Sequence, residues 1–479
     1  DIAMLQRRFT AAFIGSACVL LSLVPVCRAA DDDAKPSHPN VLFIAIDDLN
    51  HWVGHLGRNK QSKTPNLDRM AKMGATFTRA HCAAPVCNPS RAALMSGLRP
   101  GSSGIYYNSH DWRKAIPIER TLPTTFRNAG YRVTGAGKIY HGAYERDAEW
   151  DDYQHSQGEG KPSDPVADTP LRPFGPVDAP DSQWSDYKSV DYGIAELQRK
   201  HEEPFFVAVG LHKPHMPWNV PRKYYDMHPL EQIELPPYRD DDLSDLPPGG
   251  LEMAKQKEHE KIVEAGRWKQ AIQGYLAAGS FADAQVGRLL DALEQSPERD
   301  RTIVVLWGDH GWHLGEKHHW RKFALWEEAT RAPFIWVVPG LTNPGTRCDR
   351  TVDFMSIYPT LCDLCGIDTP EHVQGRSIRA LLADPTGDWD QPAITTHGRN
   401  NHAVRTEDWR YIRYADGGEE LYDETNDPYE WNNLARDPRH AARKSELAAM
   451  LPAENVPEAA DAQQKKAKRA ERAQAKAKD

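Results

Sequence analysis

The stretch NVLFIAIDD at 40–48, an apolar run that ends in two adjacent acids, constrains the fold of this chain most. A continuous apolar run is typical of a parallel strand that is buried on both faces. Segments of helical period at 64–74, 122–130 and 271–296 separate this run from others. The other runs are YRVTGAG at 131–137, PFFVAVGLH at 204–212, RTIVVLWGDHG at 301–311 and APFIWVVPG at 332–340. The alternation predicts an α/β fold in which a large, mostly parallel sheet lies between helices.

The chain divides by composition into a large domain and smaller C-terminal parts. We assign residues 38–369 to the main domain, whose Pro-, Asp- and Gly-rich stretches at 151–187 and 228–250 are expected to be surface loops that wall a substrate cleft. Shorter strand signals predict a C-terminal subdomain over 370–450 with a short antiparallel sheet. The charged, Ala/Lys-rich tail at 451–479 is expected to be a solvated, fraying helix or disordered.

Residues 4–30 read as a signal peptide. The segment begins with Arg7 and Arg8, continues with an apolar run shorter than the ~18 residues of a membrane span, and ends at Ala29 and Ala30. We therefore expect an exported protein, periplasmic or extracellular after cleavage, without a stable membrane span. The formal net charge of −9 argues against nucleic-acid binding, so that an anionic substrate would need a local cluster of positive groups.

Five of the seven cysteines lie outside the signal peptide, which is an odd number for an exported chain. Cys362 and Cys365 fall in the apolar-periodic stretch DFMSIYPTLCDLCGI, where both sulfurs would lie on one helix face. A buried helix is favoured over a zinc site, because no matching pair of cysteines or histidine cluster follows. Whether any of the cysteines form disulfides stays open.

Acidic residues follow two of the predicted strands. Asp47 and Asp48 end the run at 40–48, and Asp309 and His310 lie at the end of the fourth run. Adjacent acids at a buried strand end are costly unless a cation or an arginine neutralises them, and oxygen ligands suit a hard cation such as calcium or magnesium. The alternative is that Asp47 caps a helix and Asp309 pairs with a lysine. The matching strand-end positions favour the metal.

Basic residues cluster near the same predicted strand ends. The clusters are Lys138 and His141 in GAGKIYHG, His212, Lys213 and His215 in GLHKPHMPW, and His318, His319, Arg321 and Lys322 in HHWRK. The carboxyl ends of parallel strands meet at one edge of a sheet, where ligands bind in such folds. The clusters therefore predict an anion pocket beside the cation, although His318 and His319 also fit plain surface positions.

Cys87 stands in the stretch PVCNPSRAALMSG at 85–97. The core Cys-x-Pro-Ser-Arg resembles the signature of the type I, formylglycine-dependent sulfatases. The resemblance continues through IAIDDLN, GKIYH, LHKPHMPW, GDHGWHLGE and LYDETNDPYEWNNLA, and spans residues 39–435. It implies an alkaline-phosphatase-like sandwich. The stretch NSHDWR at 108–113 and the pair Asp309–His310, where arylsulfatases typically carry Asp-Asn, resemble the iduronate-2-sulfatase-like branch most.

The resemblance implies a modified nucleophile and a metal. A formylglycine-generating or radical maturase would oxidise Cys87 to Cα-formylglycine, whose hydrate attacks sulfur and later expels sulfate. The implied ligands of one calcium ion are Asp47, Asp48, the modified Cys87, Asp309 and His310.

The same resemblance assigns roles to the remaining site residues. Arg91 would steady the formylglycine hydroxyl, and Lys138 and Lys322 would clamp the sulfate oxygens. His141 is the expected base for sulfate release and His215 the expected acid for the leaving alcohol. The predicted substrate contacts are His212, which is also the fallback acid, and Trp112 and Trp312, which either stack on a sugar ring or only pack the loops.

The predicted activity is hydrolysis of sulfate esters on a sulfated oligosaccharide or polysaccharide, with a 2-O-sulfated uronic acid as the natural guess. A choline-sulfatase-like enzyme and a phosphonate or phosphodiester hydrolase on the same scaffold are the enzymatic alternatives. A non-catalytic binder of sulfated glycans is disfavoured, because Cys87, Arg91 and the strand-end acids are all present.

Overall fold

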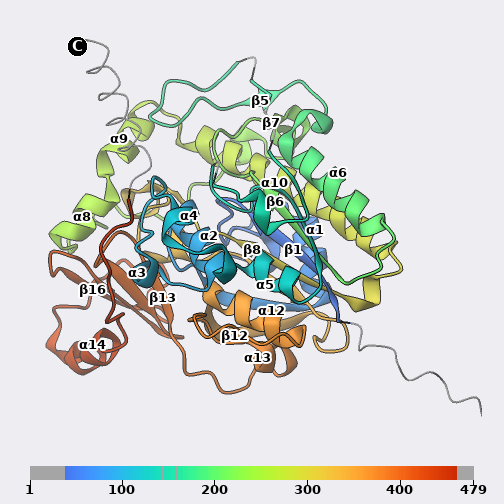
Figure 1. The fold of residues 1–479 in the computed structure, drawn as a ribbon. Helices are drawn as coiled ribbons and strands as arrows, with labels where there is room; N and C mark the ends of the chain where they lie inside the picture. The colour runs from blue at the N-terminus through green and yellow to red at the C-terminus, as the bar shows by residue number, and fades with distance from the viewer. Residues whose placement is uncertain (1–37, 143, 157–159, 163, 461–479) are drawn as a thin grey trace, which may run out of the picture. The chain divides into compact units, whose positions relative to one another are not determined.

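In the computed structural model, which describes residues 38–142, 144–156, 160–162 and 164–460, the predicted apolar runs are neighbouring strands of one eight-stranded sheet (Figure 1). Its strands, in spatial order, are β12 (Thr346–Asp353), β2 (Ala75–His81), β11 (Phe334–Val337), β8 (Thr302–Gly308), β1 (Asn40–Ile46), β6 (Phe205–Leu211), β3 (Arg132–Gly137) and β4 (Asp152–Gln154). The predicted signal peptide lies outside the described residues.

The register of the sheet brings the ends of three strands together. β1 is parallel to both β6 and β8, and Ile46 pairs with Leu211 on one side and with Gly308 on the other. Asp47, His212 and Asp309 therefore follow at the same edge of the sheet. β11 is antiparallel to β8 and β2, so the sheet is mixed but mostly parallel, as predicted.

Helices cover both faces of the sheet, because the side chains of β1 alternate between two cores. Leu42, Ile44 and Ile46 pack with α1 (Pro65–Met73), α6 (Ser185–Gln198) and α10 (Trp268–Glu294). Val41, Phe43 and Ala45 belong to the opposite core, which includes residues of the following helices. These are α2 (Cys87–Ser96), α5 (Leu122–Asn128), α12 (Ile357–Leu364) and α13 (Arg379–Ala383). Figure 1 shows α6 and α10 on one side of the strands and α5, α12 and α13 on the other.

Several shorter elements connect these layers. They are α3 (Pro100–Ser103), α4 (Trp112–Ala115), α7 (Arg222–Asp226), α8 (Pro248–Ala254), α9 (Gln256–Glu264), α11 (Glu327–Thr330), β5 (Pro176–Val177), β7 (Val220–Pro221), β9 (His313–Leu314) and β10 (Trp320–Arg321). The stretch 151–187 is not wholly irregular, because it contains β4, β5 and the start of α6.

Local sequence signals explain where α1 begins and ends. Thr64 precedes the helix, Pro65 opens it and Gly74 follows its last residue. A Cβ atom at Gly74 would lie 2.1 Å from the carbonyl oxygen of Trp336, so only glycine allows the chain to pass this close to β11.

The stretch that contains Cys362 and Cys365 forms the buried helix α12 and the residue that ends it. Both side chains are buried, and the five cysteines of the described residues are free thiols. Among the described residues, none of the helices has the length and apolarity needed to cross a bilayer.

The C-terminal part forms the predicted antiparallel sheet. Its strands, in order, are β13 (Ala393–Thr396), β14 (His402–Arg405), β15 (Trp409–Arg413) and β16 (Glu419–Asp423), and α14 (Ala441–Ala448) packs against it. The described residues from His38 to Ala460 belong to one compact unit.

The beginning of the tail segment 451–479 packs against the main domain, whereas the Ala/Lys-rich stretch expected to be a solvated helix or disordered lies almost wholly outside the described residues. The amide of Val456 donates to the carbonyl of Gly101 at 2.8 Å, and the amide of Ala459 donates to that of Gly104 at 2.8 Å. The hydroxyl of Tyr106 also donates to the carbonyl of Val456 at 2.9 Å. These bonds fix residues 454–459, whereas 461–479 lie outside the described residues.

A buried ionic cluster joins the antiparallel sheet to the main domain. The guanidinium of Arg410, fully buried, lies 2.6 Å from a carboxylate oxygen of Glu430 and 3.1 Å from one of Glu424, and it also donates to Glu327. Arg405 donates to Glu327 at 3.2 Å. Because Glu327 opens α11, these arginines hold the segment that follows Lys322.

Replacement of Arg410 by methionine should destabilise the protein by ~3–5 kcal/mol, because it leaves three buried carboxylates short of a partner. The free energy of unfolding from urea titration measures this. Arg413→Met on the same strand is the control, because that side chain is exposed and its loss should cost less than ~0.5 kcal/mol. Equal losses for the two variants would contradict the structural importance of the cluster.

Candidate active site

Cys87 is the first residue of α2 and is fully buried at the edge of the sheet where β1, β6 and β8 end. The amino end of a helix carries a partial positive charge, which favours an anion at this position. The helix ends at Gly97, whose φ of 70° suits glycine. The hydroxyl of Ser90 donates to the carbonyl of Asp309 at 2.5 Å and ties the start of α2 to the end of β8.

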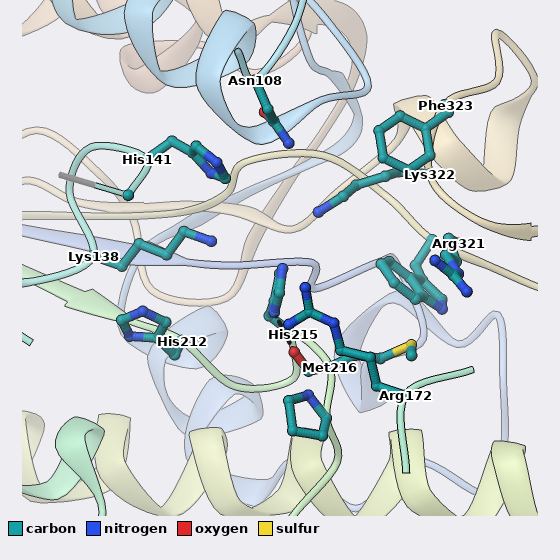
Figure 2. Close-up of a pocket in the computed structure, with 13 residues that line it drawn as sticks. Asn108, Lys138, His141, Arg172, His212, His215, Met216, Arg321, Lys322 and Phe323 are labelled. Atoms are coloured by element: carbon teal, nitrogen blue, oxygen red, sulfur yellow. Dashed lines mark hydrogen bonds between the residues drawn. The ribbon is translucent and has the colours of Figure 1, made fainter. Parts of the chain in front are cut away.

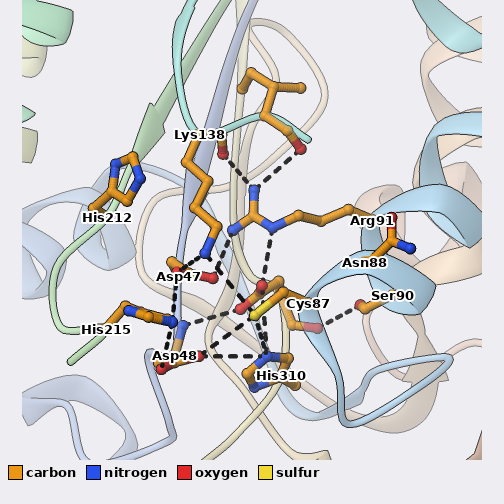
Figure 3. Close-up of polar contacts among 12 residues, drawn as sticks. Asp47, Asp48, Cys87, Asn88, Ser90, Arg91, Lys138, His212, His215 and His310 are labelled. Atoms are coloured by element: carbon orange, nitrogen blue, oxygen red, sulfur yellow. Dashed lines mark hydrogen bonds and ion pairs between the residues drawn. The ribbon is translucent and has the colours of Figure 1, made fainter. Parts of the chain in front are cut away.

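The predicted acids and His310 meet around the Cys87 sulfur (Figure 3). His310 Nε2 lies 3.4 Å from the sulfur and 3.4 Å from Asp48 Oδ1. The amide of Asp48 donates to Asp309 Oδ1 at 3.0 Å, and Asp48 has a φ of 60°, a strained value for this residue type. Ligand atoms of Asp47, Cys87, Asp309 and His310 all lie within 4.8 Å of one another.

Three cationic side chains enter the same cluster. Lys322 Nζ lies 2.8 Å from the Cys87 sulfur and 2.6 Å from Asp48 Oδ1. Lys138 Nζ lies 3.9 Å from the sulfur and contacts Asp47. Arg91 donates to Asp309 at 2.9 Å and lies 3.3 Å from Asp47 (Figure 3). The structure thus brings together the nucleophile position, the acids and the three cations predicted from the sequence.

The charges around Cys87 set its acidity. Burial would raise the pKa of the Cys87 thiol, as does Asp47, but Lys138 and Lys322 bring this pKa below its ordinary value. Burial raises the pKa of Asp48 to about 7, against the opposing charge of Lys322. The cluster therefore favours negative charge at position 87. The neighbouring cations do not fully offset the negative charge of Asp48, one of its acids.

The donor set fits a divalent cation. Asp48 Oδ2 is buried and has no hydrogen-bond partner among the described residues, so it is free to act as a ligand. The Nδ1 atom of His310 faces the carbonyl of Gly311 at 2.9 Å, which turns Nε2 toward the cluster. Three carboxylates suit a hard cation such as calcium or magnesium.

A pocket of about 560 Å³ opens above this cluster (Figure 2). Its lining includes Lys138, His141, His212, His215 and Lys322, all predicted from the sequence. Such a volume is typical of small-molecule sites.

Two histidines of the pocket, His141 and His215, are held neutral. Burial and Lys138 lower the pKa of His141 to about 3 and that of His215 well below its ordinary value. The Nδ1 atom of His215 lies 2.6 Å from the carbonyl of Met216, and its Nε2 lies 3.9 Å from Asp48. The His212 side chain is about a quarter exposed, and its amide donates to the buried carboxylate of Asp186 at 2.8 Å.

The two tryptophans differ in position. Trp312 lines the pocket, with its ring centroid 5.6 Å from Lys322 Nζ. Trp112 is buried and stacks on Tyr140 at 4.6 Å, with the guanidinium of Arg146 over its ring. Of the two interpretations of Trp112, the structure agrees with packing of the loops, because other side chains cover its ring and it is not among the residues that line the pocket.

Lys322 sits in a strained turn. Arg321 and Phe323, on either side of it, have φ values of 71° and 77°, which side chains other than glycine rarely adopt. The amide of Phe323 donates to the carbonyl of Pro85 at 3.1 Å, so the turn is pinned to the loop that precedes Cys87. Such strain is retained where the surrounding structure holds the chain firmly, often at functional sites.

Sequence reasoning gave no role to several residues that line the pocket: Asn108, Gly142, Arg172, Met216, Pro217 and Phe323. Arg172 lies in the stretch 151–187 that was predicted to wall a cleft, but no local signal distinguished it from other loop arginines. Arg321 is bound to Glu258 at 2.6 Å, whereas Arg172 is exposed and has no side-chain hydrogen bond or ion pair among the described residues.

Comparison with known proteins identifies the family. A family model described as Sulfatase matches residues 39–367, and one described as N-sulphoglucosamine sulphohydrolase, C-terminal, matches residues 315–456. A "Sulfatase" of Formosa agariphila is 40% identical and the match covers 87% of each chain. The human "Iduronate 2-sulfatase" is 29% identical, with 74% of each chain covered. The solved structure of a 2-O GAG sulfatase has a TM-score of 0.69 at 25% identity and covers 86% of this chain and 91% of its own. These likenesses confirm the predicted fold class.

We expect calcium to raise the melting temperature of the protein and a chelator to lower it, because a cation would neutralise Asp48 and its neighbours. A ligand at 100 times its Kd stabilises by ~2.7 kcal/mol. Asp48→Asn should abolish the rise in melting temperature that calcium causes, measured by differential scanning fluorimetry. Asp300→Asn, which changes an exposed acid, is the control. A calcium-dependent rise in melting temperature that persists in Asp48→Asn would place the cation elsewhere.

Proposed function

The chain belongs to the sulfatase family and is a sulfuric ester hydrolase, and we propose that it removes a 2-O-sulfate from a uronic acid residue of a sulfated glycan. The observation that carries this proposal is that three cations, Lys322, Lys138 and Arg91, converge with three acids around Cys87. The pocket above this cluster is lined by Arg172, whose guanidinium is free among the described residues. Two of the similar proteins are named for 2-sulfate removal, from iduronate and from a glycosaminoglycan, which supports the choice of position.

We propose that Cys87 is converted to formylglycine by a maturase before the enzyme acts. The hydrated aldehyde would supply a hydroxyl nucleophile together with a second hydroxyl, whose deprotonation allows sulfate to leave. The start of α2 and the nearby cations would stabilise negative charge at this position. The Cys-x-Pro-Ser-Arg context of Cys87 is the recognition signal that we propose for the maturase.

The two lysines are placed to hold the charge of the sulfate. Lys322 and Lys138 approach the Cys87 sulfur, at 2.8 and 3.9 Å, and both also line the pocket. A group bound above Cys87 would therefore lie between two ammonium groups in a buried setting, where such interactions are strong. Arg91 is bound to two carboxylates and two backbone carbonyls. It therefore holds residue 87 and the neighbouring acids, Asp47 and Asp309, in place.

Proton transfer falls to the two histidines that are neutral in the free enzyme. Burial and Lys138 lower the pKa of His141 to about 3, so its ring is neutral, and its buried Nδ1 atom has no hydrogen-bond partner within the described part of the chain. We propose this ring as the acceptor of a proton during sulfate release. We propose His215 as the acid for the leaving alcohol. The two lysines lower its pKa in the free enzyme, and the negative charge of a bound sulfate offsets them and favours the protonated ring.

We propose that Asp47, Asp48, Asp309 and His310 hold one calcium ion. Bound there, calcium would act as a Lewis acid toward the group at position 87 and toward the sulfate. The free Oδ2 atom of Asp48 supports this assignment.

Arg172 is the residue that we propose to recognise the uronate. It lines the pocket, is exposed, and has no side-chain hydrogen bond or ion pair among the described residues, so its guanidinium is available to a carboxylate. Export remains a proposal from residues 4–30, which agrees with a sulfated extracellular polysaccharide as substrate.

The mass of the peptide that contains Cys87, from protein made in its host or together with a maturase, tests the nucleophile. We expect a loss equal to a sulfur and two hydrogens with the gain of an oxygen, while the peptide that contains Cys348 stays unmodified. A plain thiol at Cys87 in protein from its host would overturn the proposed mechanism.

Arg172→Met should reduce kcat/KM for a substrate with a 2-O-sulfated uronic acid by about tenfold, which equals ~1.4 kcal/mol. Turnover of 4-nitrophenyl sulfate, which has no carboxylate, should change little. Arg299→Met on the surface is the matched control. An equal loss for both substrates would show that Arg172 does not read the carboxylate.

A further inference from the structure

A second cavity borders the pocket above Cys87. It has a volume of about 390 Å³, and Phe323 lines both hollows. Figure 2 shows the ring of Phe323 beside Lys322, on the side of the pocket away from His141 and His212. The function described so far makes no use of this cavity, which we call the Phe323 cleft.

Two chain segments cross the boundary between the hollows. Asn108 lines the catalytic pocket, and its neighbour Tyr107 lines the Phe323 cleft. Lys322 lines the catalytic pocket, and its neighbour Phe323 lines both. Since consecutive residues of both segments face the two hollows, a molecule longer than one sugar can pass from one to the other over Phe323.

The lining of the cleft suits a sugar. Tyr107 is 38% exposed, and its ring is fixed by edge contacts with His110 at 5.3 Å and with His397 at 6.4 Å. A rigid, partly exposed aromatic ring offers contact area at a low cost in conformational entropy. Asn401 adds an amide that can bond to hydroxyl groups.

The cleft contains one cation, Lys255, which can receive an anionic substituent of a sugar, and two acids, Glu252 and Asp416. The side chain of Lys255 is exposed and lies with Nζ 5.2 Å from the Phe323 ring centroid, and it has no hydrogen bond or ion pair among the described residues. Its ammonium is thus available to a sulfate or carboxylate group. Glu252 and Asp416 also line the cleft and can accept hydrogen bonds from hydroxyls.

The backbone gives independent support. Lys255, which joins α8 to α9, has a φ of 52°, and Phe323 has a φ of 77°. Both side chains that meet across the cleft thus stand on strained residues, and such strain clusters at ligand clamps.

We propose that the Phe323 cleft binds the sugars next to the sulfated one, so that the enzyme favours oligosaccharides over the isolated sulfated unit. This inference rests on the proposed function for the identity of the sugar. The sulfated residue occupies the pocket above Cys87, and the adjoining residues lie against Phe323 and Tyr107, with an anionic substituent at Lys255.

Calorimetry with the Cys87→Ala protein, in which substrate cannot turn over, tests the cleft. The probes are a 2-O-sulfated uronic acid monosaccharide and a heparin-derived hexasaccharide that ends in the same residue. We expect the hexasaccharide to bind about tenfold more tightly. Added Tyr107→Ala or Lys255→Ala should remove this difference and leave the affinity for the monosaccharide unchanged. Lys257→Ala, an exposed lysine of α9 that does not line the cleft, is the matched control.

Equal affinities for the two probes, or a difference that survives both cleft variants, would overturn the proposal. Failure of the proposed function is a separate result: the enzyme with formylglycine at position 87 would release no sulfate from either probe. Length-dependent binding that Lys255→Ala abolishes would still establish the cleft in that case.

Discussion

Six buried charged side chains surround Cys87, and the rest of the active region depends on their balance. Three are acids, Asp47, Asp48 and Asp309, and three are cations, Arg91, Lys138 and Lys322. Burial of one such charge alone would cost several kcal/mol, so each is tolerable only beside its partners. Because the six nearly cancel, the divalent cation that we propose would make the cluster positive and match it to an anionic ester.

The sequence predicted the centre of this site better than its walls. Asp47, His212 and Asp309 each end an apolar run, and parallel strands necessarily bring such ends to one edge. The strands β2 and β12 escaped prediction, because ATFTRAH and TRCDRTVD mix polar and apolar residues. The role of Trp112 stayed open and Arg172 was missed for a related reason: the direction of such a side chain depends on tertiary packing, which no local pattern encodes. The contact of residues 454–459 with α3 is likewise long-range.

The antiparallel sheet helps to hold the active site in place. Arg405 and Arg410 bind Glu327, which lies five residues after Lys322, so the position of the lysine depends on strands 80 residues further along the chain. The Phe323 cleft also takes residues from this region, Asn401 and Asp416 among them. One small sheet thus supports both the ammonium beside Cys87 and the floor on which a longer glycan would rest.

Arg321 and Phe323, the residues with positive φ on either side of Lys322, lower the stability of the fold in favour of activity. Glycine at position 321 or 323 would relieve backbone strain, and a search for thermostable variants would favour such changes. The same changes would let the turn sample other conformations and free Lys322 from its place at 2.8 Å from the Cys87 sulfur. Directed evolution for heat resistance alone would therefore drift toward a more robust but slower enzyme at this turn, so selection has to reward turnover at every round.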